Sequence, residues 1–333
     1  MENSMISRSI KAFAAVAGAA LVLTACSGGG ENTPAGGGDG AAASYKIGVN
    51  QLVQHPALDA SVEGFKEAFS EAGIEVEWDD QNANGEQATA LTIAQQFADG
   101  GKDLVLAVAT PAAQASAQAI TDVPVLCTAV TDAVEAKLVD SNEAPGGNVT
   151  GTSDAAPLEP QLDLIEAVVP GVKTIGIVYS SGEVNSQVQV DAVQAEADKR
   201  GWSLKTQTVT TANDIQQAVE ALGAVDAVYV PTDNMVVAGI ASLVKVAEAK
   251  QIPVFAAESG TVDGGAIATV GIDYKQLGKQ TGEMAIKILT EGADPGSIPV
   301  ETAKDFDYVV NEEAAKRMGV ELPADVLQKA NKG

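Results

Sequence analysis

The chain carries one succession of short apolar segments twice, and this repeat constrains its fold more than any other feature. Four landmarks recur in the same order and at nearly constant separation: IGV at 47 with IGIVY at 175, Gly73 with Gly201, VLAVAT ending at Thr110 with AVYVPT ending at Thr232, and Pro124 with Pro253. A repeat of this length indicates two copies of one structural unit in series. We therefore expect two similar lobes of the form β-α-β-α-β-α-β.

Within each copy, short Val- and Ile-rich runs alternate with Ala-rich amphipathic segments, the pattern of βαβ units and a mostly parallel sheet. The run 104–109 is apolar throughout, as is typical of a strand covered on both faces. The fold class is therefore α/β, with two doubly wound parallel-sheet lobes. We predict strands at 45–50, 74–78, 103–109, 124–127, 173–179, 203–209, 226–230, 253–257 and 266–270. We predict helices at 57–72, 86–100, 111–120, 158–168, 185–200, 213–222, 234–250 and 275–291.

Gly and Pro gather at three places where the chain is expected to cross between the lobes, near 150–156, 257–262 and 290–298. These crossovers predict lobe 1 as 45–152 plus 260–291. They predict lobe 2 as 156–257 plus 296–333.

The N-terminus carries an export signal. Arg8 and Lys11 precede an apolar stretch at 12–23, and Leu23-Thr24-Ala25-Cys26 follows it. This order resembles the lipobox of bacterial lipoproteins, which implies removal of residues 1–25 and lipid attachment to Cys26. An ordinary secretory signal or a membrane-spanning helix is the alternative, but a span needs ~20 apolar residues. Residues 26–44 are rich in Gly, Ala and Ser and predict a flexible tether, so we expect a lipid-anchored protein on the extracytoplasmic face of the cell membrane.

Composition excludes several functions. The formal net charge of −25 argues against binding to nucleic acid or to anionic lipid, which both need clustered Lys or Arg. The chain has a single histidine and shows no nucleophile motif, phosphate loop or metal-ligand spacing. We therefore predict a binding protein without a cofactor, and not an enzyme.

Several stretches resemble the tryptophan/tyrosine-type substrate-binding proteins of ABC transporters, which have a type I periplasmic-binding-protein fold. They are VNQLVQHPALDASVEGF (49–65), LAVATPAAQ (106–114), VLCTAVTDAV (125–134), PGGNVTGTSD (145–154), YSSGEVNSQ (179–187), VYVPTDN (228–234) and GIDYKQLGKQTG (271–282).

The resemblance implies a monomer that binds a small molecule between its lobes and delivers it to an ABC permease and ATPase complex. A lipoprotein that senses its ligand and signals through a membrane kinase is the alternative. A glycosidase or nucleosidase built on the same two-lobed scaffold is the enzymatic alternative.

Candidate ligand contacts follow the predicted strands, because ligands of open α/β sheets bind beyond the carboxyl ends of the strands. Thr110 is a good N-cap, and Pro111 suits the first helical position, so we expect free amides at Ala112 and Ala113. Thr128 and Ala129 follow the next strand and add a hydroxyl at the same edge. This edge predicts a carboxylate site, although a plain helix cap remains the alternative.

In the second lobe, Asp233 lies just past a strand end and suits an ammonium group, or else simply caps its own helix. Carboxylate on one lobe and ammonium on the other describe an α-amino acid, which is also what the resemblance implies. We expect lobe 2 to close on this ligand by a hinge motion. Weaker candidates, each of which could also serve its own loop or the core, are Gln51, Asp154, Asn185, Glu258 and, for the side-chain pocket, Tyr274.

Overall fold

The computed structural model describes residues 44–303 and 306–330 of the chain. The expected signal peptide, Cys26 and all but the last residue of the tether lie outside these ranges. Among the described residues, the helices are too short or too polar for any of them to cross a bilayer.

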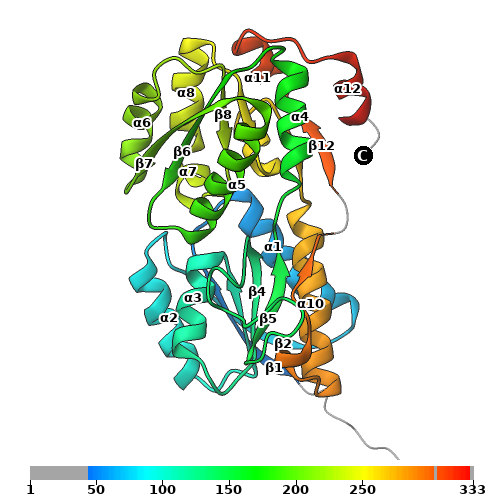
Figure 1. Ribbon diagram of the computed structural model, residues 1–333. Coiled ribbons are helices and arrows are strands. Elements are labelled where there is room, and N and C mark those ends of the chain that lie inside the picture. The colour runs from blue at the N-terminus through cyan, green and yellow to red at the C-terminus, as the bar shows by residue number, and fades with distance from the viewer. Residues whose placement is uncertain (1–43, 304–305, 331–333) are drawn as a thin grey trace, which may run out of the picture. The chain divides into compact units, whose positions relative to one another are not determined.

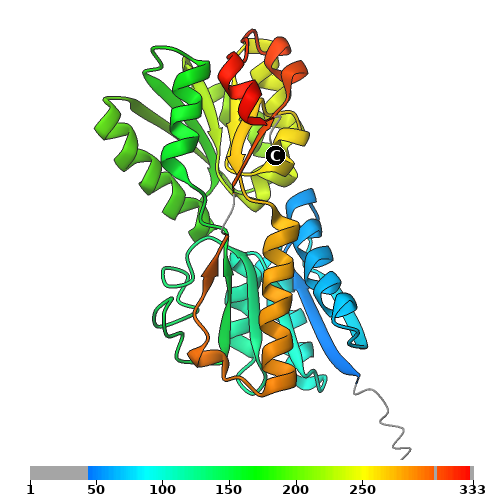
Figure 2. The same ribbon diagram turned by 90° about the vertical axis from the view of Figure 1, so that its right-hand side faces the viewer.

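Two six-stranded sheets form the framework (Figures 1 and 2), as the internal repeat predicts. We call the first sheet with its helices lobe 1 and the second lobe 2. The strand orders β11-β5-β4-β3-β1-β2 and β12-β10-β9-β8-β6-β7 correspond position by position. All neighbouring strands are parallel except β10 and β12. The expected α/β class with doubly wound parallel sheets is confirmed.

Every strand and helix predicted from the apolar pattern has a counterpart. Lobe 1 contains β1 (Tyr45–Gln51), α1 (Pro56–Glu71), β2 (Val76–Asn82), α2 (Gln87–Asp99), β3 (Leu104–Val108), α3 (Thr110–Ala119), β4 (Val125–Val130), β5 (Val149–Ser153), α10 (Tyr274–Glu291), η2 (Pro295–Ser297) and β11 (Glu301–Thr302). Lobe 2 contains α4 (Leu158–Val168), β6 (Thr174–Ser180), α5 (Val184–Arg200), β7 (Ser203–Val209), η1 (Ala212–Asp214), α6 (Ile215–Ala221), β8 (Ala227–Val230), α7 (Asn234–Ala238), α8 (Ile240–Lys250), β9 (Val254–Ala256), α9 (Ser259–Asp263), β10 (Ala268–Gly271), β12 (Asp307–Val310), α11 (Glu312–Arg317) and α12 (Ala324–Ala330).

Strand β5 escaped prediction because it has almost no apolar side chains. All five of its residues are buried, and its polar groups are satisfied inside lobe 1. Thr152 shares hydrogen bonds with the Thr128 hydroxyl at 3.2 Å and the Thr281 hydroxyl at 2.8 Å. Gly151 has φ 147°, and a Cβ there would overlap the backbone of Cys127.

The crossovers between lobes differ from those expected from Gly and Pro content. The first lies at 154–157, between β5 and α4, close to the expected 150–156. The second lies at 272–273 and not at 257–262, because β10 pairs with β9 and so belongs to lobe 2. The third follows β11, which pairs with β5, and precedes β12, so it does not lie at 290–298.

Consequently the second part of lobe 1 is not 260–291. It begins with helix α10 and ends with β11. Lobe 2 keeps α9 and β10, which the predicted boundary had assigned to lobe 1. The strands β9 and β10 contribute only three and four residues, so backbone pairing and not apolar length decides where they belong.

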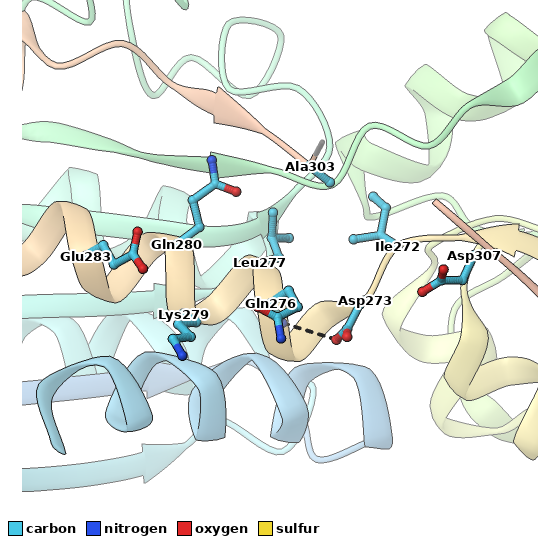
Figure 3. Close-up of a pocket in the computed structure, with 9 residues that line it drawn as sticks. All are labelled: Ile272, Asp273, Gln276, Leu277, Lys279, Gln280, Glu283, Ala303 and Asp307. Carbon is cyan, nitrogen blue, oxygen red and sulfur yellow. Dashed lines mark hydrogen bonds between the residues drawn. The ribbon is translucent and has the colours of Figure 1, made fainter. Parts of the chain in front are cut away.

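A pocket of about 330 Å³ lies beside the second and third crossovers (Figure 3). Its lining is largely polar and includes Asp273, Gln276, Lys279, Gln280 and Glu283. None of these side chains is buried, and none has a buried polar atom without a hydrogen-bond partner. Solvent can serve all of them, so this pocket has no unmet requirement for a ligand.

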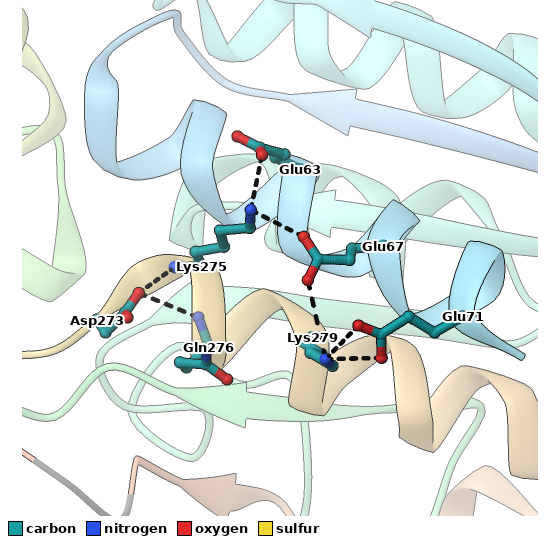
Figure 4. A network of polar contacts seen from close by, with 7 residues as sticks. All are labelled: Glu63, Glu67, Glu71, Asp273, Lys275, Gln276 and Lys279. Atoms are coloured by element: carbon teal, nitrogen blue, oxygen red, sulfur yellow. Dashed lines mark hydrogen bonds and ion pairs between the residues drawn. The ribbon is translucent and has the colours of Figure 1, made fainter.

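Helices α1 and α10 lie side by side in lobe 1 (Figures 1 and 2). Glycines at the contact allow the backbones to approach closely: a Cβ on Gly64 would overlap the Lys275 carbonyl, and one on Gly278 would overlap the Ser61 carbonyl. Two lysines of α10 pair with acids of α1 along the rim (Figure 4), at 2.8 Å for Lys275 with Glu63 and 2.7 Å for Lys279 with Glu71. These ion pairs are partly exposed, so they contribute little to the free energy of unfolding, although they help to orient α10 on α1.

Replacing Gly64 by alanine is therefore expected to push α1 away from α10 and to lower the free energy of unfolding by about 3 kcal/mol, as overpacking against backbone does. Urea denaturation followed by circular dichroism measures this loss. Gly147→Ala is the control, because its Cβ meets open space at a φ that alanine accepts. Equal stability of the two variants would contradict the close packing of α1 on α10.

Candidate functional site

The candidate site lies where the carboxyl ends of the parallel strands of both lobes meet. One cavity there is lined by side chains from both lobes. Lobe 1 and the crossovers contribute His55, Ala57, Leu58, Ala129, Asp154 and Tyr274, and lobe 2 contributes Thr232, Asp233, Asn234, Val237 and Glu258. The free space is about 10 Å³, roughly the room that one water molecule needs.

Two strained residues mark the ends of β3 and β4. Ala109 has φ 80° and ψ 153°, a conformation that is otherwise almost confined to glycine, and Ala129 has φ 56°. The two strand ends are linked by the Ala109 amide, which donates to the Thr128 carbonyl at 3.0 Å. Backbone strain of this kind concentrates at ligand-binding sites. Both residues directly adjoin threonines that were selected from the sequence.

Thr110 begins α3 and is 2% exposed, and its hydroxyl has no hydrogen-bond partner. A buried hydroxyl without a partner costs free energy unless something else bonds to it. It does not cap α3, whose first residues have no side-chain cap. The capping alternative for Thr110 is therefore wrong in this structure, and its hydroxyl is available to a ligand.

The neighbouring carboxylate contacts are arranged differently from the expectation. Thr128 is fully buried, and its hydroxyl bonds to Thr152 within lobe 1. Ala112 is fully buried as well, and the amide of Ala113 is not free, because it donates to the Ala109 carbonyl at 3.0 Å. Gln51, half-buried, uses its amide nitrogen on the Val53 carbonyl and the Asp59 carboxylate. Of the lobe 1 residues expected to bind the ligand carboxylate, only Ala129 lines the cavity, and Thr110, Ala112 and Thr128 do not.

Asp154 and Tyr274 join two crossovers. The Tyr274 hydroxyl donates to Asp154 Oδ2 at 2.6 Å, and the Thr131 hydroxyl donates to Asp154 Oδ1 at 2.9 Å. Thr131 also meets the Thr232 hydroxyl of lobe 2 at 3.2 Å. Burial raises the pKa of Asp154 above its ordinary value. This carboxylate therefore lies on a crossover, lines the cavity and is linked through Thr131 to lobe 2.

Asp233 is fully buried and has donors on both oxygens. Its Oδ1 accepts from the Val236 amide at 2.8 Å, so Asp233 caps α7. Its Oδ2 accepts from the Ser180 amide and the Ser186 hydroxyl, both at 2.6 Å. The capping role left open by the sequence is thus what the structure shows for Asp233, although its side chain also lines the cavity.

Glu183 was not singled out from the sequence, and it shares the N-terminus of α7 with Asp233. Its oxygens accept from the Asn234 amide at 3.1 Å and the Met235 amide at 3.2 Å, the first two amides of α7. Burial, followed by the charge of Asp233, raises the pKa of Glu183 to about 7. Burial also raises the pKa of Asp233. The only sequence signal for Glu183 was its position in the loop after a predicted strand.

Glu258 and Asn185 serve lobe 2 as well. Glu258 caps α9, with the Thr261 amide at 2.6 Å, and burial raises its pKa. Asn185 donates to Glu183 at 3.1 Å and to the Thr232 carbonyl at 2.9 Å, while its own Oδ1 has no partner.

The cavity is acidic: Asp154, Asp233 and Glu258 line it, and no lysine or arginine does. Its only basic group is His55, whose pKa burial lowers to about 4. Within the described ranges, no group of three or more His, Cys, Asp or Glu could hold a metal ion. The arrangement favours a ligand that brings its own positive charge.

Comparisons with known proteins agree with this architecture. Residues 46–333 match the family described as ABC transporter substrate binding protein. A tyrosine-binding protein of Clostridioides difficile is 41% identical over 288 residues, which cover 85% of this chain and 83% of that protein.

Two solved structures are also similar. An ABC domain in complex with L-Trp from Streptococcus pneumonia has a TM-score of 0.83 at 39% identity, covering 86% of this chain and 99% of that chain. A substrate binding protein with adhesive properties from Clostridium difficile, in a ligand-free, open structure, has a TM-score of 0.66 at 45% identity, covering 84% and 97%.

The raised pKa of Glu183 predicts a specific dependence of stability on pH. Between its ordinary pKa of 4.5 and about 7, the folded protein binds a proton at Glu183 that the unfolded chain lacks. This group therefore stabilises the fold more at pH 5 than at pH 7.5, and its contribution falls as the pH rises through about 7.

Replacement by Gln removes this titration, so Glu183→Gln is expected to cost roughly 1–2 kcal/mol more at pH 5 than at pH 7.5. Urea denaturation at both values measures the difference. His55 titrates in the opposite sense in both proteins and cancels in the comparison. An exposed replacement, Glu143→Gln, is the control, and an equal cost of Glu183→Gln at the two pH values would refute the assignment.

Proposed function

Because this chain belongs to the family of ABC transporter substrate binding proteins, we propose that it captures an aromatic amino acid between its two lobes. The family and its relatives are substrate-binding proteins and not enzymes, so the function to be specified is the ligand. One relative is named for tyrosine, and another was solved with L-Trp. The single observation in this chain that carries the proposal is the acidic cavity that Asp154, Asp233 and other side chains of both lobes line.

The unpartnered hydroxyl of Thr110 supports binding of the ligand carboxylate at the ends of β3 and β4. This hydroxyl can donate to an anion without a competing internal acceptor. The strained backbone at Ala109 and Ala129 fixes the strand ends next to it. Neither element brings a formal positive charge, so the pair suits a single carboxylate better than a polyanion.

Asp154 is the best partner for the ligand ammonium. Asp233 and Glu258 each accept three hydrogen bonds, at least two of them from backbone amides that would otherwise be unsatisfied. Asp154 accepts only two side-chain hydroxyls and keeps more acceptor capacity on its oxygens. We therefore assign the contact with the ligand ammonium to Asp154 and not to Asp233, which contributes only its negative charge to the cavity.

The size of the cavity supports a hinge motion. An aromatic amino acid cannot enter a space of about 10 Å³ unless the lobes separate. The arrangement of this chain also fits the L-Trp complex better than the open, ligand-free relative, although the open relative has the higher identity. Ligand would then stabilise the closed form through its higher affinity for that form.

Export and anchoring complete the proposal. Lipid attachment at Cys26 would hold the protein on the extracytoplasmic face of the membrane, with the following residues as a tether. The loaded, closed form would deliver its ligand to an ABC permease and ATPase complex, for import of the amino acid.

Calorimetric titration tests the ligand. L-Trp and L-Tyr are expected to bind, whereas tryptamine, which lacks the carboxylate, and indole-3-propionate, which lacks the ammonium, are expected to bind far more weakly. Thr110→Val should lower the affinity for the amino acid about tenfold or more, because a hydrogen bond to a charged group is lost.

The matched control is Thr269→Val, which removes another buried, unpartnered hydroxyl, from β10 of lobe 2 and not from the ends of β3 and β4. Both replacements are expected to raise the midpoint of thermal unfolding slightly, since each removes an unsatisfied polar group. Only Thr110→Val should weaken binding. Unchanged affinity in Thr110→Val, or equal binding of tryptamine, contradicts the proposed carboxylate contact.

Fractionation of cells tests the anchor. Cys26→Ser is expected to move the protein from the membrane fraction to the soluble or secreted fraction. Cys127→Ser is the matched control, because Cys127 is buried in lobe 1 and cannot receive a lipid. Membrane association of Cys26→Ser at the level of the unaltered protein would rule out lipid attachment.

A further inference from the structure

His55 has a buried side chain whose position is not explained by the helix that it precedes. It is the residue before α1, is 8% exposed and lines the cavity. It does not cap α1 with its side chain. Its Nε2 faces Asn234 Oδ1 of lobe 2 at 3.5 Å, whereas its Nδ1 is buried and has no hydrogen-bond partner.

The contacts of Asn234 fix which nitrogen of His55 carries the proton. Oε2 of Glu183 accepts from the Asn234 backbone amide and from Asn185 Nδ2, so the Asn234 side-chain atom bonded to this oxygen is the donor Nδ2. The carbonyl oxygen of Asn234 therefore faces His55 and must itself accept. Nε2 of His55 is then the donor, and Nδ1 of the neutral ring holds a lone pair.

Burial keeps the ring neutral. Removal from water lowers the pKa of His55 to about 4, although the bond to Asn234 and the charge of Asp59 act in the opposite direction. A neutral ring with Nε2 protonated cannot donate from Nδ1. A ligand carboxylate oxygen beside Nδ1 would place two lone pairs against each other, whereas an N–H group would satisfy the nitrogen.

We propose that His55 Nδ1 accepts a hydrogen bond from the α-ammonium of the bound amino acid, which makes His55 a specificity-determining residue for a free amine. This inference rests on the proposed function. An ammonium has three N–H donors, so it can bond to His55 and to Asp154 at once, and both residues line the same cavity. Because His55 belongs to lobe 1 and its tautomer is set by lobe 2, the acceptor is correctly presented only when the lobes are together.

Two replacements separate the ligand contact from the contact between lobes. His55→Asn keeps an acceptor near the position of Nδ1 and loses the group that reaches Asn234. His55→Gln keeps a donor near the position of Nε2 and loses the acceptor that faces the cavity. Titration of L-Trp is expected to show about a 10- to 100-fold loss of affinity in His55→Gln and a loss within about threefold in His55→Asn.

The reverse order, or an equal loss in the two variants, would overturn the inference. Thermal unfolding of both variants checks that they fold. Indole-3-propionate provides a second comparison, because it has no ammonium: His55→Gln is expected to leave its affinity unchanged relative to the unaltered protein. A comparable loss for both ligands would also overturn the inference.

Nuclear magnetic resonance of the unaltered protein tests the tautomer without any variant. His55 is the only histidine of the chain, so every imidazole signal belongs to it. Long-range ¹H–¹⁵N spectra at pH 7 are expected to show a neutral ring with Nε2 protonated, and addition of L-Trp should shift Nδ1 as an acceptor. A charged ring, or Nδ1 protonated in the loaded protein, refutes the proposal.

Failure of the proposed function looks different. If calorimetry shows no binding of L-Trp, L-Tyr or any other amino acid to the unaltered protein, the ligand assignment falls and the role of His55 falls with it. If amino acids bind but neither the variants nor the spectra behave as described, only the role of His55 is wrong.

Discussion

The site depends on which groups accept hydrogen bonds from the backbone amides at helix N-termini, in a region where the two lobes exclude water. Amides in the first turn of a helix need acceptors, and water cannot serve them in a closed seam. Lobe 2 supplies its own acceptors: Asp233 caps α7, Glu258 caps α9, and Glu183 accepts from the first amides of α7. In lobe 1, α1 and α3 begin with Pro in the first turn and have no side-chain cap. The two lobes thus differ in how these helix starts are satisfied, and at the start of α3 in lobe 1 the Thr110 hydroxyl has no partner.

The crossovers between the lobes and the cavity share residues. Asp154 lies on the first crossover, Tyr274 follows the second, and they hydrogen-bond to each other at the edge of the cavity. Thr131 extends this contact to Thr232 of lobe 2. A ligand that altered the hydrogen bonds of Asp154 would therefore act directly on the segments that join the lobes.

Predictions from the sequence were correct where a pattern of apolar side chains is typical of only one kind of element. Apolar runs located the strands, and strand ends located Ala129, Asp154 and Asp233, which line the cavity. The predictions failed where backbone pairing or hydroxyl bonds replaced apolar contacts. Strand β5 is one case, and the assignment of β10 to lobe 2 is another. Thr128 looked like Thr110 in sequence, yet its hydroxyl bonds to Thr152, a residue whose proximity no local pattern reveals.

The sequence by itself determined the class of fold, the duplication into two lobes and the edge of each sheet where a ligand would lie. These follow from periodicity and from the polarity of parallel strands, which are local properties of the chain. Only the tertiary structure decided which polar groups at that edge are already satisfied. Asp233 caps α7, and Glu183 accepts a hydrogen bond from the first amide of the same helix. Thr110 and His55 each have a buried polar atom without a hydrogen-bond partner. The reason is physical: whether a polar atom is free for a ligand depends on neighbours that folding brings from distant parts of the chain.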